Sequence, residues 1–294
     1  MNSFLKLLLL FLIVISVFPA DDIKPDSPEG VLHFADHLFQ YGEYRRAATE
    51  YLRYYSLYFD KEDSDHALFN AAFSLEKSEE YSNARNFYMM LKNKSGNDYK
   101  AGLAGYRYAV NHFLDENIDS CLIYIDEYRA SESFSHRYLE GFCYLKMREY
   151  ALAESLYYSL ASINAASELS SSVHYLISKS RQGSSLPARN PATAALMSTV
   201  IPGLGMGYSE RWGDAFFSFM AVAVTIAPAV YFYEEDRTFS ITTGLIGLFF
   251  YGGNIYGSAN AAKKFNEKKH KDFYNSTLEG VPFQPDEINT NFKP

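Results

Sequence analysis

The sequence has 294 residues and a formal net charge of −8 at pH 7. That length allows one large domain or two smaller ones. The excess negative charge lies before residue 184, and an acidic surface repels nucleic acid, whose binding depends on Lys and Arg that neutralise phosphates. We therefore expect no nucleic-acid partner.

Residues 1–20 have the layout of a secretory signal peptide. Lys6 precedes an apolar run, and Pro19-Ala20 with an acidic pair comes after it, which favours cleavage after Ala20. Phe18 stands where a small residue is preferred, so an uncleaved anchor is the alternative. In both cases the next segment of the chain is expected to be exported.

Residues 21–183 are predicted to form a helical repeat domain. Apolar residues recur there at i, i+3, i+4 and i+7, the pattern of amphipathic helices. A Tyr-x-x-Ala-x-x-x-Tyr motif recurs roughly every 35 residues, with a weaker copy at Ile118, Cys121 and Ile125, and a small residue precedes each copy. The motif residues are Tyr44, Ala47, Tyr51, Tyr81, Ala84, Tyr88, Tyr150, Ala153 and Tyr157, and the preceding small residues are Ala35, Ala72, Ala109 and Gly141.

The spacing and residue types resemble the tetratricopeptide repeat. The resemblance implies four antiparallel helical hairpins over about residues 28–165, in which small residues let helices approach and aromatics fill the space between hairpins. Residues 168–180 would form a capping helix. Gly42 has no glycine counterpart in later copies, and the usual proline between repeats is missing, so the repeat boundaries are less defined than the repeats themselves.

The chain contains two cysteines, Cys121 and Cys143. An exported protein could join them, because oxidising compartments permit disulfides. The simpler interpretation is two small buried residues on neighbouring helices.

A turn-rich linker at 184–190 separates the repeats from a predicted transmembrane domain at 191–262. Residues 215–233 and 239–257 carry no charge, and each is long enough to cross a hydrocarbon core of about 30 Å as a helix. Residues 191–208 form a third, weaker apolar segment. The tail at 263–294 begins basic and ends polar, without a periodicity that indicates structure.

The sequence IPGLGMGY at 201–208 is a candidate phosphate loop or a membrane element. A dinucleotide site needs the spacing G-x-G-x-x-G after a strand, and a P-loop needs a terminal Gly-Lys-Ser/Thr. Gly203, Gly205 and Gly207 have neither pattern. The phosphate-site hypothesis is therefore rejected.

The segment instead resembles a family of bacterial membrane proteins of unknown function that have a short membrane hairpin domain. A P-G-x-G-x-x-Y-x-x-x-x-G signature opens that domain and a Y-x-G-N-x-Y-G signature closes it, and the resemblance covers about 188–266. Met206 departs from the family, where glutamine is common. The matching residues are Pro202, Gly203, Gly205, Tyr208 and Gly213 in the first signature, and Tyr251, Gly253, Asn254, Tyr256, Gly257, Ala261 and Asn266 in the second.

Gly253, Gly257 and Ala261 are four residues apart and predict a small face for close helix packing. Asn254 could hydrogen-bond across that contact. These residues either pack the hairpin internally or bind a partner.

No catalytic, cofactor or metal site is expected. His33 and His37 have the i, i+4 spacing of zinc ligands, but the glutamate of the metalloprotease motif and a third ligand are missing. No nucleophile elbow or catalytic Cys/His signature appears. The protein is therefore not expected to be an enzyme.

The predicted fold is all-α: a tetratricopeptide-like solenoid followed by a bundle of two or three transmembrane helices. We expect a scaffold in the bacterial inner membrane whose exported repeats bind a protein or peptide on their concave face. The alternative is an oligomeric assembly or transport component that acts through the transmembrane domain. The basic cluster from Lys263 to Lys271 predicts a cytoplasmic tail, which requires residues 191–208 to cross the membrane as well.

Overall fold

The computed structural model describes residues 26–94, 98–127, 134–163 and 169–281. All regular elements in these ranges are helices, with no strand among the described residues, which confirms the all-α prediction. The signal peptide predicted at 1–20 and the end of the tail, 282–294, lie outside the described residues.

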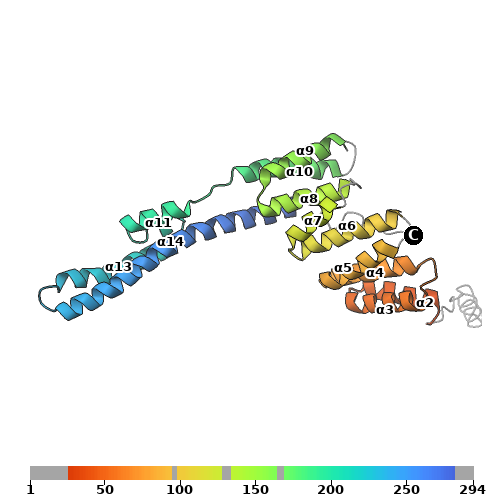
Figure 1. The fold of residues 1–294 in the computed structure, drawn as a ribbon, viewed down its shortest axis with the longest axis horizontal. Helices are drawn as coiled ribbons and strands as arrows, with labels where there is room; N and C mark the ends of the chain where they lie inside the picture. The colour runs from red at the N-terminus through yellow and green to blue at the C-terminus, as the bar shows by residue number, and fades with distance from the viewer. Residues whose placement is uncertain (1–25, 95–97, 128–133, 164–168, 282–294) are drawn as a thin grey trace, which may run out of the picture. The chain divides into compact units, whose positions relative to one another are not determined.

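Figure 1 shows the helices in chain order. They are α2 (Pro28–Gln40), α3 (Tyr44–Leu57), α4 (Ser64–Lys77), α5 (Tyr81–Lys94), α6 (Asp98–Leu114), α7 (Ile118–Glu127), α8 (Phe134–Met147), α9 (Tyr150–Ile163), α10 (Leu169–Ser184), α11 (Pro191–Val200), α12 (Leu204–Tyr208), α13 (Trp212–Tyr231) and α14 (Arg237–Gly280).

The described chain divides into two compact units, one ending at Leu139 and one beginning at Glu140. The division lies within α8, whereas the composition of the sequence changes at residue 184. The two points differ because α10 packs against both α9 and α14, which joins the last repeat helices to the C-terminal unit.

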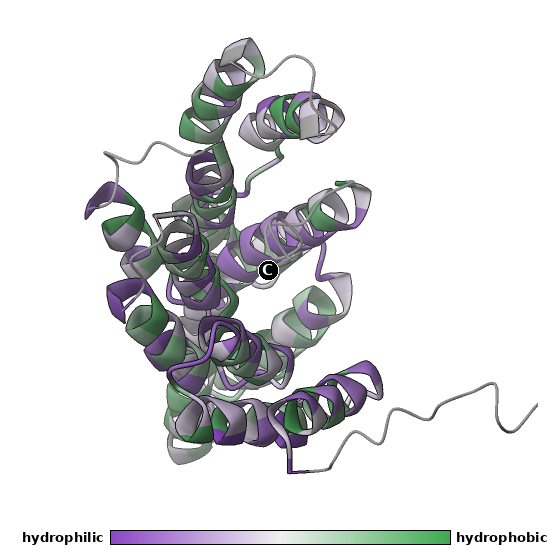
Figure 2. Ribbon diagram, turned by 90° about the vertical axis from the view of Figure 1, so that its right-hand side faces the viewer, coloured by the Kyte–Doolittle hydropathy of each residue, from purple (hydrophilic) through white to green (hydrophobic). Residues whose placement is uncertain are grey.

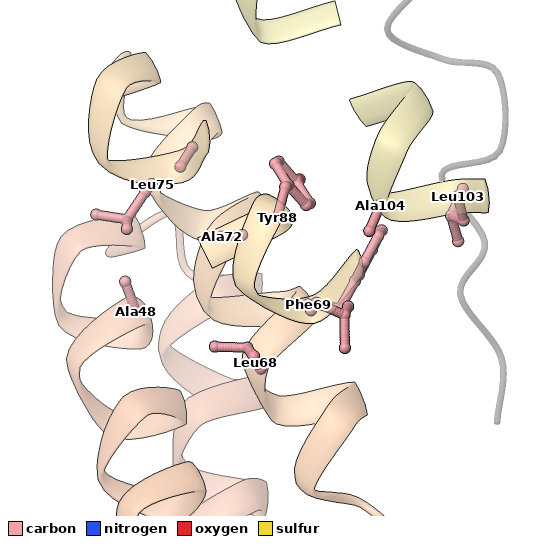
Figure 3. Packing of buried hydrophobic residues seen from close by; sticks show 10 residues of the cluster. Ala48, Leu68, Phe69, Ala72, Leu75, Tyr88, Leu103 and Ala104 are labelled. Atoms are coloured by element: carbon pink, nitrogen blue, oxygen red, sulfur yellow. The ribbon is translucent and has the colours of Figure 1, made fainter. Parts of the chain in front are cut away.

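In the first unit, α2 to α7 form consecutive helical hairpins. Figure 2 shows that hydrophilic and hydrophobic residues both occur along the helices of the protein. Tyr51 of α3 packs in a cluster with Ala67 and Ala71 of α4. One hairpin later, Tyr88 of α5 lies in a cluster with Ala104 of α6 (Figure 3). The same kind of contact, a large ring against small residues of the next hairpin, therefore joins successive hairpins.

The turns inside the hairpins share one unusual backbone conformation. Gly42, Glu79, Glu116 and Arg148 have φ values of 75°, 63°, 58° and 69°, in the left-handed region. In each turn the next residue donates its N–H to a carbonyl five residues earlier, which closes the preceding helix. The turn thus recurs with the sequence motif, although only the first copy has the glycine that this conformation favours.

The motif residues of the repeats are largely buried. Ala35, Ala47, Tyr51, Ala72, Ala84, Tyr88, Ala109, Tyr150, Ala153 and Tyr157 are all buried, whereas Tyr44 and Tyr81 are partly exposed. A Cβ at Gly141 would lie 2.3 Å from the Tyr157 ring, so a side chain there would require the ring to move. Cys121 and Cys143 are buried thiols rather than halves of a disulfide.

The second unit ends in one long helix. The tail was expected to lack regular structure from residue 263, but α14 continues without a break to Gly280. Phe273 and Thr277 are buried on this C-terminal half, so packing as well as helix propensity supports it. Residues 185–190 connect α10, which ends at Ser184, to α11, which begins at Pro191.

Among the described residues, α13 is the one helix whose length and composition suffice to cross a membrane. The apolar segment 239–257 is part of α14. Residues 191–208 are broken into α11 and α12, and the ten residues of α11 rise only about 15 Å. The predicted bundle of two or three transmembrane helices is therefore not established by the fold alone.

Candidate functional site

The segments that contain the two sequence signatures contact each other along α14. Later residues of α11 contact earlier residues of α14. The Ser198 and Ser258 hydroxyls lie 2.7 Å apart, and the Tyr251 hydroxyl donates to the carbonyl of Thr199 at 2.5 Å. Near the end of α13, the Ser240 hydroxyl donates to the carbonyl of Ala229 at 2.5 Å, and near its start the Ser218 hydroxyl donates to Asn254 Oδ1 at 2.8 Å.

Both α11 and α13 therefore run antiparallel to α14 and in the same direction as each other. The three-crossing topology needs the chain to reverse between residues 191–208 and 215–233. In the structure the chain does not reverse there, and the two segments form one broken arm that lies along α14.

The break in this arm explains the glycines of the first signature. Gly203 has a φ of 86°, and a Cβ there would lie 2.1 Å from the Ala215 carbonyl oxygen. At Gly205 a Cβ would lie 1.9 Å from the carbonyl oxygen of Ala194. Pro202 precedes both glycines and removes a backbone donor at the point where the helix stops. The glycines are thus required for backbone packing, not for binding phosphate.

Asn254 of the second signature fills the break. Its Oδ1 accepts the Gly203 N–H at 2.7 Å and the Ser218 hydroxyl at 2.8 Å, and its Nδ2 donates to the carbonyl of Ser198 at 3.1 Å. Asn254 is 3% exposed. The side-chain amide of Asn254 therefore joins α11, the Gly203 turn and α13 to α14. A hydrogen bond from Asn254 across a helix contact is what the sequence analysis considered.

Ser198 extends this polar network and was missed by the sequence analysis. Its hydroxyl accepts the Gly205 N–H at 2.9 Å and hydrogen-bonds Ser258. Ser258 lies four residues after Asn254, on the same face of α14. That spacing was the available signal, but a serine in an apolar segment is not distinctive.

Asn266 holds the start of the broken arm. Its side chain accepts the Arg189 N–H at 2.7 Å and donates to the Arg189 carbonyl at 2.9 Å, as a strand partner would. The Arg189 guanidinium lies over the rings of Tyr208 and Phe265, 4.8 and 5.2 Å from their centroids. Tyr208 and Asn266 from the two signatures thus contact the same residue.

The predicted small face is only partly internal. A Cβ at Gly257 would lie 2.8 Å from the Met206 methyl carbon, and Ala261 is 1% exposed. Gly253 has no atom within 4 Å of its Cβ position, and neither does Gly213. The face that packs inside the hairpin is centred on Asn254, Ser258 and Ala261, so Gly253 lies beside it. Tyr256 is 77% exposed.

The C-terminal half of α14 contacts the last repeat helices. The Tyr150 hydroxyl of α9 lies 2.9 Å from Nδ1 of His270, and the two rings stack with centroids 5.8 Å apart. Burial, then Arg148, lowers the pKa of His270. The Tyr175 hydroxyl of α10 donates to the Ser276 carbonyl at 3.4 Å.

These contacts bear on the predicted topology. Groups 2.9 Å apart occupy one compartment, so residues 263–280 lie on the same side of any membrane as α9 and α10. The arrangement with exported repeats and a cytoplasmic basic segment stays a prediction, and the contact between Tyr150 and His270 argues against it. The prediction of a cytoplasmic tail rests on charge alone, whereas residues of this part of α14 also contact α9 and α10.

His33 and His37 lie on α2 and are exposed, and the described residues contain no group of three or more potential metal ligands. His37 instead packs its ring against Tyr41.

A scan of known family models finds none that matches the chain, and a search of curated proteins finds no similar sequence. The resemblances to tetratricopeptide repeats and to the membrane hairpin family therefore stay predictions.

Proposed function

We propose that the protein is a membrane-anchored scaffold, in which α13 and the first half of α14 form a two-helix membrane hairpin and the helical repeats bind a protein or peptide. The observation that carries the proposal is the exposure of α13. Only 11% of its most apolar stretch is buried.

Large apolar side chains project outward from both helices of this hairpin. Patches of this kind on soluble proteins rarely exceed a few hundred Å², and larger ones mark protein or membrane contacts. On α13 they are Trp212, Phe216, Phe217, Phe219, Met220, Val224, Val230 and Tyr231, and on α14 they are Phe239, Ile241, Leu245, Ile246, Leu248, Phe249, Phe250 and Tyr256.

Aromatic residues mark the two ends of this surface. Trp212 begins α13, and Tyr231 and Tyr233 lie at its end, all of them exposed. The 20 residues of α13 rise about 30 Å, which matches the hydrocarbon thickness of a bilayer. Trp and Tyr are enriched at both membrane interfaces, so their positions support a crossing helix.

The hydropathy of α14 is lower than that of α13, which agrees with this proposal because the polar side chains of α14 form hydrogen bonds within the hairpin. Asn254 and Ser258 bond within the hairpin, and the Thr242 and Thr243 hydroxyls donate to carbonyls one turn earlier, those of Thr238 and Phe239. Polar groups satisfied in this way are tolerated in lipid. The outward face of the helix remains apolar.

A charge on the outward face tests the anchor. In water an exposed Val224→Lys change would alter stability by about 0.5 kcal/mol or less. In a bilayer centre a lysine costs about 2.5–3.5 kcal/mol. We expect Val224→Lys to shift the protein from the membrane fraction to the soluble or aggregated fraction, whereas Ile123→Lys, at an exposed position of α7, leaves it in the membrane. Equal fractionation of the two variants contradicts the proposal.

The proposed anchor has two crossings, with the repeats and residues 263–280 on one side and the acidic turn Glu234–Asp236 on the other. We place the repeats outside, because the N-terminal signal acts before the hairpin is made. Single cysteines at Ser184 and Ser276, with Cys121 and Cys143 replaced, are then both labelled by an impermeant reagent in spheroplasts. Labelling of neither would place the repeats in the cytoplasm, and labelling of Ser184→Cys alone would contradict the two-crossing arrangement.

One observation favours the alternative, an oligomeric membrane component. The Cβ positions of Gly213, Gly252 and Gly253 have no neighbour within 4 Å, which leaves room for a second hairpin to approach. A Gly253→Leu change separates the two functions. Loss of a crosslinked oligomer in membranes would support assembly through the hairpin, and an unchanged monomer would favour the simple anchor.

A further inference from the structure

A pocket of about 200 Å³ opens between the first helices of the first two hairpins. Six of its residues come from α2 and α4, and the seventh is Tyr51 of α3. The lining residues are Asp36, Phe39, Gln40, Tyr51, His66, Asn70 and Phe73. The first helices of the two hairpins therefore supply most of the pocket lining.

The single carboxylate of the lining is held in place by a buried phenol. The Tyr51 hydroxyl donates to Asp36 Oδ1 at 2.5 Å, and Tyr51 is 2% exposed. Burial, together with the neighbouring Asp36, raises the pKa of Tyr51, so the phenol stays protonated and remains a donor. The remaining lone pairs of the exposed Asp36 carboxylate are available to a ligand.

The other polar groups of the lining are neutral. Asn70 Nδ2 lies 3.0 Å from His66 Nε2. Burial is the main cause that lowers the pKa of His66; Asp36 and Asp63 oppose the shift, and Lys100 adds to it. With His66 uncharged, no lining group carries a positive charge that would balance Asp36.

Two rings form the apolar wall. Phe39 and Phe73 stack with centroids 5.6 Å apart. Phe73 already has Lys77 and Arg107 near its ring, at 5.2 and 5.1 Å from the centroid. A further cation would therefore find its charge partner in Asp36, while the rings contact the hydrocarbon stem.

We propose that this pocket binds one lysine or arginine side chain from an extended segment of a partner protein. This inference rests on the proposed scaffold function and specifies what the repeats recognise. The volume is below the roughly 300–1,000 Å³ of pockets for drug-sized ligands, and suits a single side chain. A fixed carboxylate at one wall and apolar rings at another match a charged head on an alkyl stem.

The test uses the full chain in detergent and ligand-observed saturation-transfer NMR. The probes are acetylated, amidated pentapeptides of alanine with arginine, lysine or citrulline at the centre. Citrulline keeps the shape of arginine and lacks its charge. We expect the arginine and lysine peptides to bind about tenfold or more tightly than the citrulline peptide, because hydrogen bonds to charged groups are the strong ones.

Asp36→Asn should remove that preference, and Tyr51→Phe should weaken it by releasing the carboxylate. Glu62→Gln is the matched control, since it removes an exposed carboxylate outside the pocket and should leave binding unchanged. Circular dichroism checks that each variant is folded.

Equal binding of all three peptides, or a charge preference that survives Asp36→Asn, would overturn the cation pocket while leaving peptide binding by the repeats intact. Binding of none of the peptides would overturn the pocket and count against the scaffold function as well. Membrane fractionation of Val224→Lys would still test the anchor separately.

Discussion

The first unit and the proposed membrane hairpin bury opposite kinds of side chain. In the first unit the largest buried residues include Tyr54, Phe69 and Tyr88. In the hairpin the buried residues are small or polar, such as Asn254 and Ser258, and the large apolar side chains point outward. Water drives rings into the first interior, whereas lipid offers the same environment as an apolar core, so close backbone approach and hydrogen bonds hold helices together there.

The first unit also buries a charged pair, which is an exception to this contrast. Removing one partner of that pair should lower stability more than the other changes considered below. Glu76 and Arg107 form an ion pair that is almost fully buried. Glu76 also accepts hydrogen bonds from Tyr88 at 3.1 Å and Asn111 at 2.7 Å. Removing one partner of such a pair costs about 3–5 kcal/mol, because the other charge stays buried.

Glu76→Gln should therefore lower the urea midpoint of the repeats strongly, and the double variant with Arg107→Met should recover much of the loss. Circular dichroism monitors all the helices, while fluorescence of Trp212, the single tryptophan, monitors the hairpin. A fall in the fluorescence midpoint equal to that of the dichroism would mean that the two regions do not unfold independently.

Acid should destabilise the first unit more than the hairpin. Burial, with a smaller contribution from Lys92, lowers the pKa of His136 from 6.5 to about 4, and the pKa values of His66 and His112 are lowered as well. The unfolded chain takes up its proton near pH 6.5 and the folded chain only near pH 4. The stability from neutral His136 is thus present above that window and is lost as the pH falls through it, by roughly 3 kcal/mol at most.

The measurement is the urea midpoint of the dichroism between about pH 7 and pH 4, compared in the parent and in His136→Gln. The variant should show a flatter dependence. If both proteins respond alike, the uncharged state of His136 does not contribute to the pH dependence.

Small substitutions in the hairpin should depend on the backbone rather than on hydrophobicity. Gly205→Ala would place a Cβ against the Ala194 carbonyl, and we expect a loss of about 1–3 kcal/mol. Gly253→Ala meets open space and should be neutral or stabilise the helix by up to about 1 kcal/mol. Protease resistance in detergent, read as the half-life of the hairpin, ranks the two variants. A shorter half-life for Gly253→Ala would contradict the structure.

The recurring turn gives the smallest effect. Gly42→Glu should cost about 1–2 kcal/mol, the usual cost of a left-handed backbone for a residue with a Cβ. The reverse change, Glu79→Gly, removes that strain but adds freedom to the unfolded chain, so its net effect should stay within about 1 kcal/mol. Relative to the parent protein, the urea midpoint should therefore shift more in Gly42→Glu than in Glu79→Gly. Equal and opposite shifts would show that the two turns are interchangeable.

Those parts of the fold that depend on periodicity could be predicted from the sequence. The all-α fold and the expected capping helix at 168–180 were visible because apolar and small residues recur at helical spacing. The left-handed turns at Glu79, Glu116 and Arg148 were not, because glycine is the usual signal for that conformation and these copies lack it.

The site was predictable where a residue type is unusual for its place. Asn254 in an apolar segment indicated a hydrogen bond across helices, and Pro202 with its glycines indicated a break. The partners of Asn254 could not be predicted, since they depend on which stretch of α14 lies beside the break. Asp36 gave no signal either, because one carboxylate on a helix is ordinary until Tyr51 and Phe73 are placed around it.

Because α14 is continuous, it fixes the rotation of the α13–α14 hairpin relative to the last repeat helices about the α14 axis. Each residue turns a helix by about 100°, so the direction in which Asn254 points determines the direction in which His270 points. One residue inserted near Phe265 would turn His270 away from Tyr150, whereas seven residues would nearly restore its direction, since two helical turns take about seven residues. The angular position of α9 and α10 about this axis is therefore encoded in the number of residues between Asn254, Asn266 and His270.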